Sequence, residues 1–293
     1  MSLFKSYKIR LVIYSVLLLI SVIPIIFSTV STLKNTYRNK ELFNIELSRF
    51  KSIEDITAHI DGIYSVTHSS PEIDTLDYVK ATSEIVKKRF YHGLSEYSLK
   101  DNWIAYIGSK LFWKHLNAIV EPDDILDYNE GLCSQQTIVF LEILKRKGIK
   151  TRWVGLGYIE GPGHFLAEVY YHGKWHLYDV NLEPKWERVT NHHESIAYYK
   201  QYQDSLFLAY EGIISRSLFD KIMEKVQYGE VNEFPAKNML LFHYVTKIIT
   251  YLIPIFLGCL ILLTLFKQKV PSKIIQKTAS RLKGKEKEVE LIE

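Results

Sequence analysis

Three side chains within about fifty residues have the types and local settings that acyl transfer on a thiol requires. Cys133 follows Gly131 and precedes an apolar-periodic stretch, His164 follows a glycine-rich turn, and Asp179 lies near the end of a run of strand-forming residues. A thiolate nucleophile needs a base to take its proton and a third group to orient that base. The sequence therefore predicts a catalytic site made of Cys133, His164 and Asp179.

The position of Cys133 gives the thiol a reason to be reactive. Residues 135–147 have the apolar spacing of an amphipathic helix that Gly148 ends, so Cys133 lies at a helix N-terminus. The helix dipole there favours the thiolate, and the unsatisfied backbone N–H groups can bind a developing oxyanion. Gly131 would allow an unusual backbone angle or a close approach of substrate. A small buried hydrophobic residue is the alternative role for a free cysteine.

The pairing of two predicted strands brings His164 and Asp179 together. His172-Gly173 resembles a two-residue hairpin turn, which would place His164 opposite Asn181. Because side chains alternate along a strand, His164 and Asp179 would then share one face as diagonal neighbours. Asp179 would hold the imidazole tautomer, with Asn181 as the reserve orienting group, whereas a three-residue loop would reverse the faces. Asp179 could instead cap the next turn, and His164 could be an ordinary residue at a strand end.

The motifs resemble, in order, the core of the transglutaminase-like superfamily. The family pattern of G-x-C before a helix, G-[I/V]-x-[A/T]-R-x-V, H-x-[W/F]-x-E-[V/I] and G-x-W-x-x-x-D is similar to residues 131–133, 148–154, 164–170 and 173–179. The resemblance covers about a sixth of the chain. It implies a papain-like arrangement, with Cys133 as nucleophile, His164 as base and acid and Asp179 as the orienting carboxylate. Ser134 and Leu166 stand where the family often has tryptophan, which disfavours a specific transglutaminase more than it disfavours the fold.

Two apolar segments, residues 11–30 and 248–266, are long enough to cross the ~30 Å hydrocarbon core of a bilayer. Residues 267–293 hold eight basic and four acidic residues, which predicts that this end is cytoplasmic. Two spans would place both termini in the cytoplasm and residues 34–247 outside it, in a periplasm or its equivalent. The first segment could also be a signal peptide, but it is longer than a typical h-region and no A-x-A-like site follows it.

The distribution of charge argues against a nucleic-acid partner. Of the 37 basic residues, three precede residue 34 and eight follow residue 266, and four of the 33 acidic residues follow residue 266. The middle of the chain is therefore slightly acidic, with 26 basic and 29 acidic residues. Two cysteines make no disulfide framework, and adjacent histidines at His192-His193-Glu194 would point apart. We expect no metal and no cofactor.

The simplest organisation is one α+β domain between two transmembrane helices, with the helix that carries Cys133 packed on an antiparallel sheet. We expect a stub and first span over 1–33, a juxtamembrane helical segment over 34–75, the extracytoplasmic transglutaminase-like domain over 76–238, the second span over 239–266 and a basic tail over 267–293. Predicted helices cover 41–66, 76–90, 102–116, 135–147 and 198–228, and predicted strands cover 151–158, 165–171 and 174–180. We expect the aromatic residues of 102–116 to serve packing, and family analogy makes Trp103 a candidate second oxyanion donor.

These observations favour a membrane-anchored thiol enzyme, either a cysteine protease or a transglutaminase-like acyl transferase. It would hydrolyse or transfer peptide or amide bonds of a peptide or protein substrate in the cell envelope. The alternative is a catalytically inactive scaffold or binding module in envelope or polysaccharide assembly.

Overall fold

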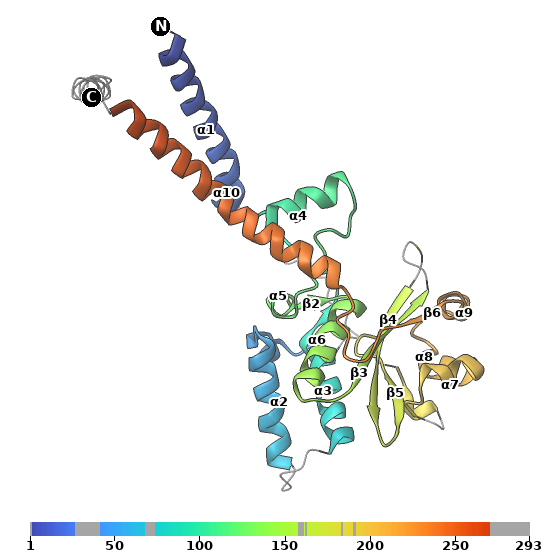
Figure 1. Cartoon of the computed structure of the whole chain (residues 1–293). Helices are drawn as coiled ribbons and strands as arrows, with labels where there is room; N and C mark the ends of the chain where they lie inside the picture. Colours follow the sequence, from blue (N-terminus) through green and yellow to red (C-terminus); the bar gives the residue numbers. More distant parts are fainter. Residues whose placement is uncertain are drawn as a thin grey trace, which may run out of the picture. The chain divides into compact units, whose positions relative to one another are not determined.

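The fold was obtained as a computed structural model, which describes residues 2–26, 42–67, 74–157, 161, 163–182, 184–189 and 192–269. Its elements are mixed helices and strands, which confirms the α+β class. They form two compact units (Figure 1). The first, which we call the helical unit, comprises Met1–Val30, Ser98–Ile107 and His243–Glu293, and the second, the sheet unit, comprises Ser31–Tyr97 and Gly108–Phe242.

The helices and short 3-10 turns are α1 Ser2–Ile26, η1 Ile45–Arg49, α2 Ile53–Thr67, α3 Thr75–Arg89, α4 Leu99–Leu111, α5 Pro122–Leu126, α6 Cys133–Arg146, η2 Trp186–Arg188, α7 Ile196–Gln201, α8 Gln203–Tyr210, α9 Arg216–Met223 and α10 Lys237–Lys269. The strands are β1 Tyr91–His92, β2 Glu130–Gly131, β3 Thr151–Gly157, β4 Gly163–Tyr171, β5 Lys174–Tyr178 and β6 Val226–Tyr228.

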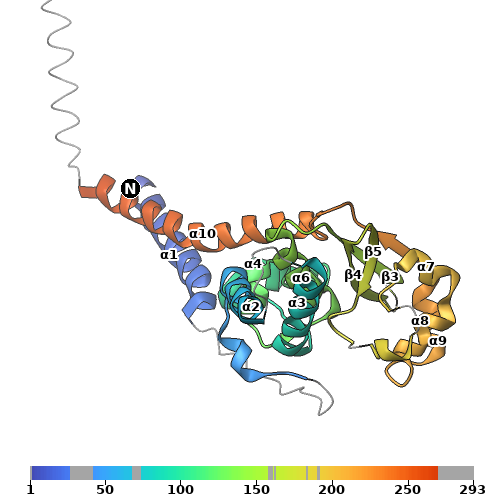
Figure 2. The same cartoon turned by 90° about the horizontal axis from the view of Figure 1, so that it is seen from below.

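The sheet unit is built around an antiparallel sheet of order β5-β4-β3-β6. Helices α2, α3 and α6 lie on one side of this sheet and α7, α8 and α9 on the other (Figures 1 and 2). On the second side, sheet residues such as Val154, Leu166 and Leu177 pack into a buried apolar cluster with α7–α9. The sheet is thus enclosed between two helical layers, and one of them contains the helix that starts at Cys133.

The hairpin between β4 and β5 has the predicted register. Tyr171 pairs with Lys174 and Ala167 pairs with Tyr178, so the loop contains two residues. Both of them have positive φ, 48° at His172 and 80° at Gly173, as a type I′ turn requires. The local turn chemistry is therefore sufficient to fix which side chains share a face.

Two predicted helices are wrong in part. Residues 41–66 do not form one helix, because Ser52 Oγ accepts from the Asp55 N–H and Asp123 accepts from the Ile53 N–H, so that a new helix, α2, begins at Ile53. The helical pattern predicted up to residue 228 ends earlier. Val226–Tyr228 form β6, which completes the sheet on the open edge of β3. Pairing with a strand distant in the sequence is not visible in the local pattern.

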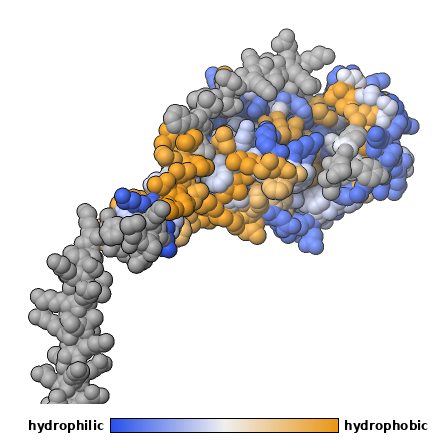
Figure 3. All heavy atoms as spheres, turned by 90° about the horizontal axis from the view of Figure 1, so that it is seen from above, coloured by the Kyte–Doolittle hydropathy of each residue, from blue (hydrophilic) through white to orange (hydrophobic). Residues whose placement is uncertain are grey.

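One candidate membrane span lies within the described residues, Lys237–Phe266 of α10. The sequence predicts two spans, and no second candidate is found among the described residues. The predicted first segment, 11–30, is described only to Ile26. The basic tail lies mostly beyond the described residues. Figure 3 shows apolar side chains gathered over these helices on the face drawn.

A buried ion pair fastens the middle of the sheet to α7. Glu168 is fully buried, its Oε2 lies 2.5 Å from an Arg152 Nη2, and its Oε1 accepts from the Ile196 N–H at 2.7 Å. The Arg152 guanidinium also lies over the rings of Trp175 and Tyr228, at 4.3 and 4.7 Å from their centroids. Removing one partner of such a pair leaves an uncompensated charge.

Glu168→Gln is expected to lower the free energy of unfolding by about 3 kcal/mol, because Arg152 loses its buried counter-charge. The measurement is urea unfolding of the detergent-solubilised full chain. Glu194→Gln is the matched control, since Glu194 pairs with a Lys174 side chain that is 54% exposed, and it should cost under about 1 kcal/mol. Equal effects of the two substitutions would contradict a structural role for the Arg152–Glu168 pair.

Candidate active site

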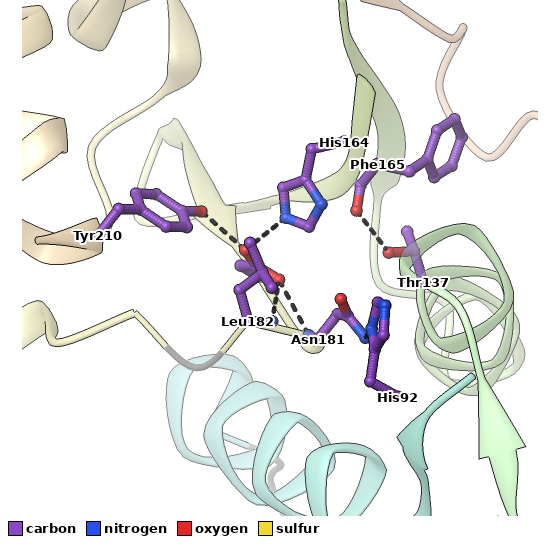
Figure 4. A network of polar contacts seen from close by, with 8 residues as sticks. His92, Thr137, His164, Phe165, Asn181, Leu182 and Tyr210 are labelled. Atoms are coloured by element: carbon purple, nitrogen blue, oxygen red, sulfur yellow. Dashed lines mark hydrogen bonds and ion pairs between the residues drawn. The ribbon is translucent and has the colours of Figure 1, made fainter. Parts of the chain in front are cut away.

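The Asp179 carboxylate is buried and has hydrogen bonds on both oxygens. Oδ2 lies 2.6 Å from His164 Nε2 and accepts from the Tyr210 hydroxyl at 2.8 Å. Oδ1 accepts from the backbone N–H groups of Asn181 at 2.9 Å and Leu182 at 3.1 Å. Figure 4 shows these groups converging on the carboxylate. Four partners compensate the burial of this charge.

The His164–Asp179 pair strongly perturbs the titration of both groups. Burial lowers the pKa of the His164 imidazole, but the charge and hydrogen bond of Asp179 outweigh this effect and raise it well above its ordinary value. Burial raises the pKa of Asp179, and the charge and hydrogen bond of His164 with the two backbone N–H groups outweigh that effect and lower it. The imidazole is therefore positively charged at neutral pH, beside an ionised carboxylate.

Cys133 faces this imidazolium and is half-buried. Burial raises the pKa of its thiol, whereas the hydrogen bond and charge of His164 and a backbone hydrogen bond from Phe165 lower it. The lowering effects prevail, so the pKa of Cys133 is below the ordinary thiol value. The structure therefore brings all three sequence-predicted residues together, and the contact with His164 lowers the pKa of the Cys133 thiol.

Helix α6 begins at Cys133 with its first backbone N–H groups uncapped by a side chain. The N-cap residue is Leu132, which has no acceptor atom, and its own N–H donates to Gln135 Oε1 at 3.1 Å. Gln135 Nε2 donates to the carbonyls of Ser95 and Ile119, each at 2.8 Å. The Gln135 side-chain amide thus holds the start of α6 in place. It does not occupy the backbone N–H groups at Cys133, which stay available to an anion.

A side chain at position 131 would be crowded. The Gly131 backbone is not among those with positive φ, so the unusual angle allowed by the sequence is not used. A Cβ there would lie 3.1 Å from Gln136 Cγ and 3.4 Å from the Phe90 ring, so these side chains would have to shift by a few tenths of an ångström. Gly131 pairs with His92 in the short parallel ladder of β1 and β2. The glycine therefore eases the close packing of Phe90 and Gln136 two residues before Cys133.

Phe165 joins α6 to β4 and so helps to hold Cys133 near His164. Its backbone forms the hydrogen bond to the Cys133 sulfur, and its carbonyl accepts from the Thr137 hydroxyl at 3.2 Å. Thr137 lies one helical turn after Cys133, on the same side of α6. The Phe165 backbone, next to His164, makes both bonds. The position of α6 relative to β4 is therefore not held by the Cys133 and His164 side chains alone.

Asn181 does not orient His164 with its side chain. Its amide Nδ2 lies 3.2 Å from His92 Nδ1, and the amide N–H donates to the ring (Figure 4). Asp179 is therefore the group that contacts the His164 ring, and Asn181 links it to a second imidazole, that of His92.

Sequence reasoning missed Tyr210 and His92. Tyr210 is 31 residues from Asp179 along the chain and belongs to α8, and no local sequence motif indicates that it contacts Asp179. His92 reaches the site through the β1–β2 ladder. Trp103, the candidate oxyanion donor, belongs to the helical unit, where it lines an apolar cavity with residues of α1 and α10. Among the residues that the structure describes, no group of three or more His, Cys, Asp or Glu side chains is suited to a metal.

No protein-family model matches the chain, and no curated protein matches it. A solved structure described as the crystal structure of a TGase is similar to it, with 21% identity over 58% of this chain and 39% of that chain and a TM-score of 0.29. The chain thus matches about two fifths of that protein. A similarity this low supports no functional argument, so the case for a function rests on the geometry of the site itself.

The lowered pKa of Cys133 predicts a thiol that alkylates at a lower pH than an ordinary cysteine. With Cys259→Ser to leave one thiol, the rate of iodoacetamide labelling against pH should have its midpoint below about 8.5. His164→Gln removes the cation that stabilises the thiolate, so the midpoint should move upward. The measurement is intact-mass spectrometry at a series of pH values.

His176→Gln is the matched control for this experiment. His176 is another buried histidine of the sheet unit, but its ring nitrogens bond to the carbonyls of His193 and Tyr171, each at 3.2 Å. Its substitution should leave the midpoint where it is. A midpoint that is the same in the wild type and in His164→Gln would show that the imidazole does not activate the thiol.

Proposed function

We propose that the sheet unit is a thiol enzyme that cleaves or transfers acyl groups of peptide or amide substrates. The observation that carries this proposal is the chain of contacts from Cys133 through His164 to Asp179, with the pKa of the thiol lowered and that of the imidazole raised. A purely structural cysteine would need neither an imidazolium beside it nor a buried carboxylate behind that imidazolium. The arrangement is the one expected of a papain-like core.

In the first half of the reaction, the Cys133 thiolate attacks the carbonyl carbon of an amide. The carbonyl oxygen gains the negative charge, and the free backbone N–H groups at the start of α6 stabilise it. The tetrahedral intermediate collapses as the His164 imidazolium gives its proton to the leaving nitrogen. An amine or ammonia departs, and the acyl group remains on the sulfur as a thioester.

In the second half, neutral His164 takes a proton from an acceptor, which attacks the thioester. Water as the acceptor gives a carboxylic acid, and an amine gives a new amide. The second tetrahedral intermediate then expels the Cys133 thiolate while the imidazole keeps the proton, which restores the starting thiolate–imidazolium pair. Asp179 stays ionised throughout and holds the ring with Nε2 toward itself. Hydrolysis of a peptide or isopeptide bond is the form of the reaction that we favour.

The site is anchored to a membrane in this proposal. α10 supplies one span, and α1 supplies a second, because its apolar side chains are exposed over most of its length; Val12 and Leu19 are each 61% exposed. Outward-facing apolar side chains on a long helix suit lipid and are costly in water. The basic tail would face the cytoplasm, which places the sheet unit outside it. Substrates would then be peptides or proteins of the cell envelope.

Cys133→Ala should lower activity by at least ~10³-fold, because the covalent step is lost. The purified full chain is incubated with dimethylated casein, and with a panel of peptides, in the presence of a biotinylated primary amine. Amine incorporation reports transamidation, ammonia release reports deamidation, and new N-termini found by mass spectrometry report proteolysis. Cys259→Ser, which removes the thiol of α10, is the matched control and should retain activity.

Two outcomes would count against the proposal. Equal product formation by the wild type and by Cys133→Ala would assign the activity to a contaminant. A wild type that forms none of the three products on any substrate, while its thiol alkylates only at the pH of an ordinary cysteine, would favour the inactive scaffold.

A further inference from the structure

Five consecutive residues at the end of α4, Lys110-Leu111-Phe112-Trp113-Lys114, are all exposed. The exposed fractions are 69% at Leu111, 84% at Phe112 and 43% at Trp113. The sequence predicts that these aromatic residues are packed within a helix reaching residue 116, and this is wrong, because α4 ends at Leu111. Three adjacent large apolar side chains turned outward between two lysines need a partner surface.

Asn102 determines how α4 is placed. Its backbone is non-helical, with φ −158° and ψ 80°, and its Oδ1 accepts from the Ala105 N–H at 3.1 Å, so it caps the straight part of the helix. Its Nδ2 donates to Thr246 Oγ1 of α10 at 2.7 Å. Asn102 is fully buried, and so is Ala105. The cap therefore fastens the start of the straight segment directly to the candidate membrane span.

The two sides of α4 differ in character. Asn102, Ala105 and Ser109 form a buried side of small and polar residues. The opposite side repeats apolar residues every fourth position, at Trp103, Ile107 and Leu111, and Ile107 is 39% exposed. This apolar side runs without interruption into Phe112 and Trp113.

The apolar side begins in a crevice of the helical unit. Trp103 and Ile107 line a cavity of about 310 Å³ together with Leu17, Ile20 and Ser21 of α1 and Ile253 and Leu257 of α10. A second contact joins the same elements, because the Tyr251 hydroxyl donates to the Lys100 carbonyl at 3.5 Å. Thr246 precedes the apolar stretch 248–266 and Tyr251 lies near its start. With this stretch as the proposed span, α4 meets α10 near the membrane–water interface.

We propose that the apolar side of α4 and the segment Lys110–Lys114 lie in the interfacial layer of an anionic bilayer, and this inference rests on the proposed membrane anchoring. Tryptophan and phenylalanine are suited to the headgroup level, since their rings bury apolar area near the acyl chains. Lysines on both flanks extend their ammonium groups to lipid phosphates. A bilayer surface accounts for aromatic residues, lysines and the adjoining span together.

The segment between Ser95 and Ile119, which contains α4 and Lys110–Lys114, is held at both of its ends by α6, the helix that starts at Cys133. Gln135 of α6 accepts from the Ser95 N–H at 3.0 Å and donates to the carbonyls of Ser95 and Ile119 at 2.8 Å each. The Ile119 N–H in turn donates to the Ser95 carbonyl at 3.1 Å, which joins the two ends of this segment. Contact of Phe112 and Trp113 with lipid would hold the start of α6, and Cys133 with it, near the bilayer. The substrate would then be a membrane-associated chain.

The depth of single spin labels in vesicles tests the inference. The full chain carries Cys133→Ala and Cys259→Ser, with one new cysteine as Phe112→Cys, Val231→Cys or Ile255→Cys. Val231 is a loop residue of the sheet unit, 53% exposed, and Ile255 is a residue of α10, 61% exposed. Each labelled protein is reconstituted in vesicles of phosphatidylcholine and phosphatidylglycerol. Power saturation then compares accessibility to oxygen, which enters lipid, with accessibility to a water-soluble nickel chelate.

We expect the ratio of oxygen to nickel accessibility at Phe112→Cys to be several-fold higher than at Val231→Cys and lower than at Ile255→Cys. A label at Phe112→Cys that matches Val231→Cys, while Ile255→Cys is in lipid, overturns the inference and leaves the anchoring intact. A nickel-accessible Ile255→Cys overturns the anchoring itself. A Phe112→Cys label shielded from both reagents and broadened by a second label would assign this surface to another copy of the chain, which also overturns the inference.

Discussion

The buried carboxylate of Asp179 is the constraint on which the site depends. A charge that is almost fully removed from water is tolerated only with donors on both of its oxygens. Two backbone N–H groups satisfy one oxygen and thereby determine the turn that follows β5. His164 and Tyr210 satisfy the other and join β4 and α8 to the same atom. The hydrogen bonds that compensate this one charge therefore orient the His164 imidazole, form the turn after β5 and hold α8 in place.

Much of this arrangement follows from short-range chemistry, which is why the sequence predicts it. Two residues with positive φ at His172-Gly173 determine the β4–β5 register, and the register places His164 and Asp179 on one face. The prediction of a helix over 135–147, directly after Cys133, also rests on local periodicity, and α6 covers Cys133–Arg146. Features that depend on distant partners are the ones that were missed. Tyr210 reaches Asp179 through helix packing, and β6 forms only because β3 offers an open edge.

The errors in the helical segments have a common physical cause. Apolar periodicity indicates that a segment is helical but does not indicate where a polar side chain will stop it. Ser52 and Asp123 cap a new helix inside a stretch that reads as continuous, and Asn102 does the same for α4. Apolar periodicity also does not indicate which apolar residues face solvent. Phe112 and Trp113 have the composition of core residues and are exposed, so their exposure is information that only the structure provides.

The charge balance of the site explains the free helix start at Cys133. In the proposed resting state, ionised Asp179, the His164 imidazolium and a Cys133 thiolate together carry one net negative charge. The hydroxyl of Tyr210 and the N–H groups of Asn181 and Leu182 are directed to the carboxylate, so they offset the charge at one end. At the other end the sulfur has the Phe165 backbone and the positive end of the α6 dipole. A side-chain cap at residue 132 would occupy those N–H groups, whereas leucine leaves them free; in the proposed mechanism they stabilise the thiolate and, after attack, the substrate oxygen.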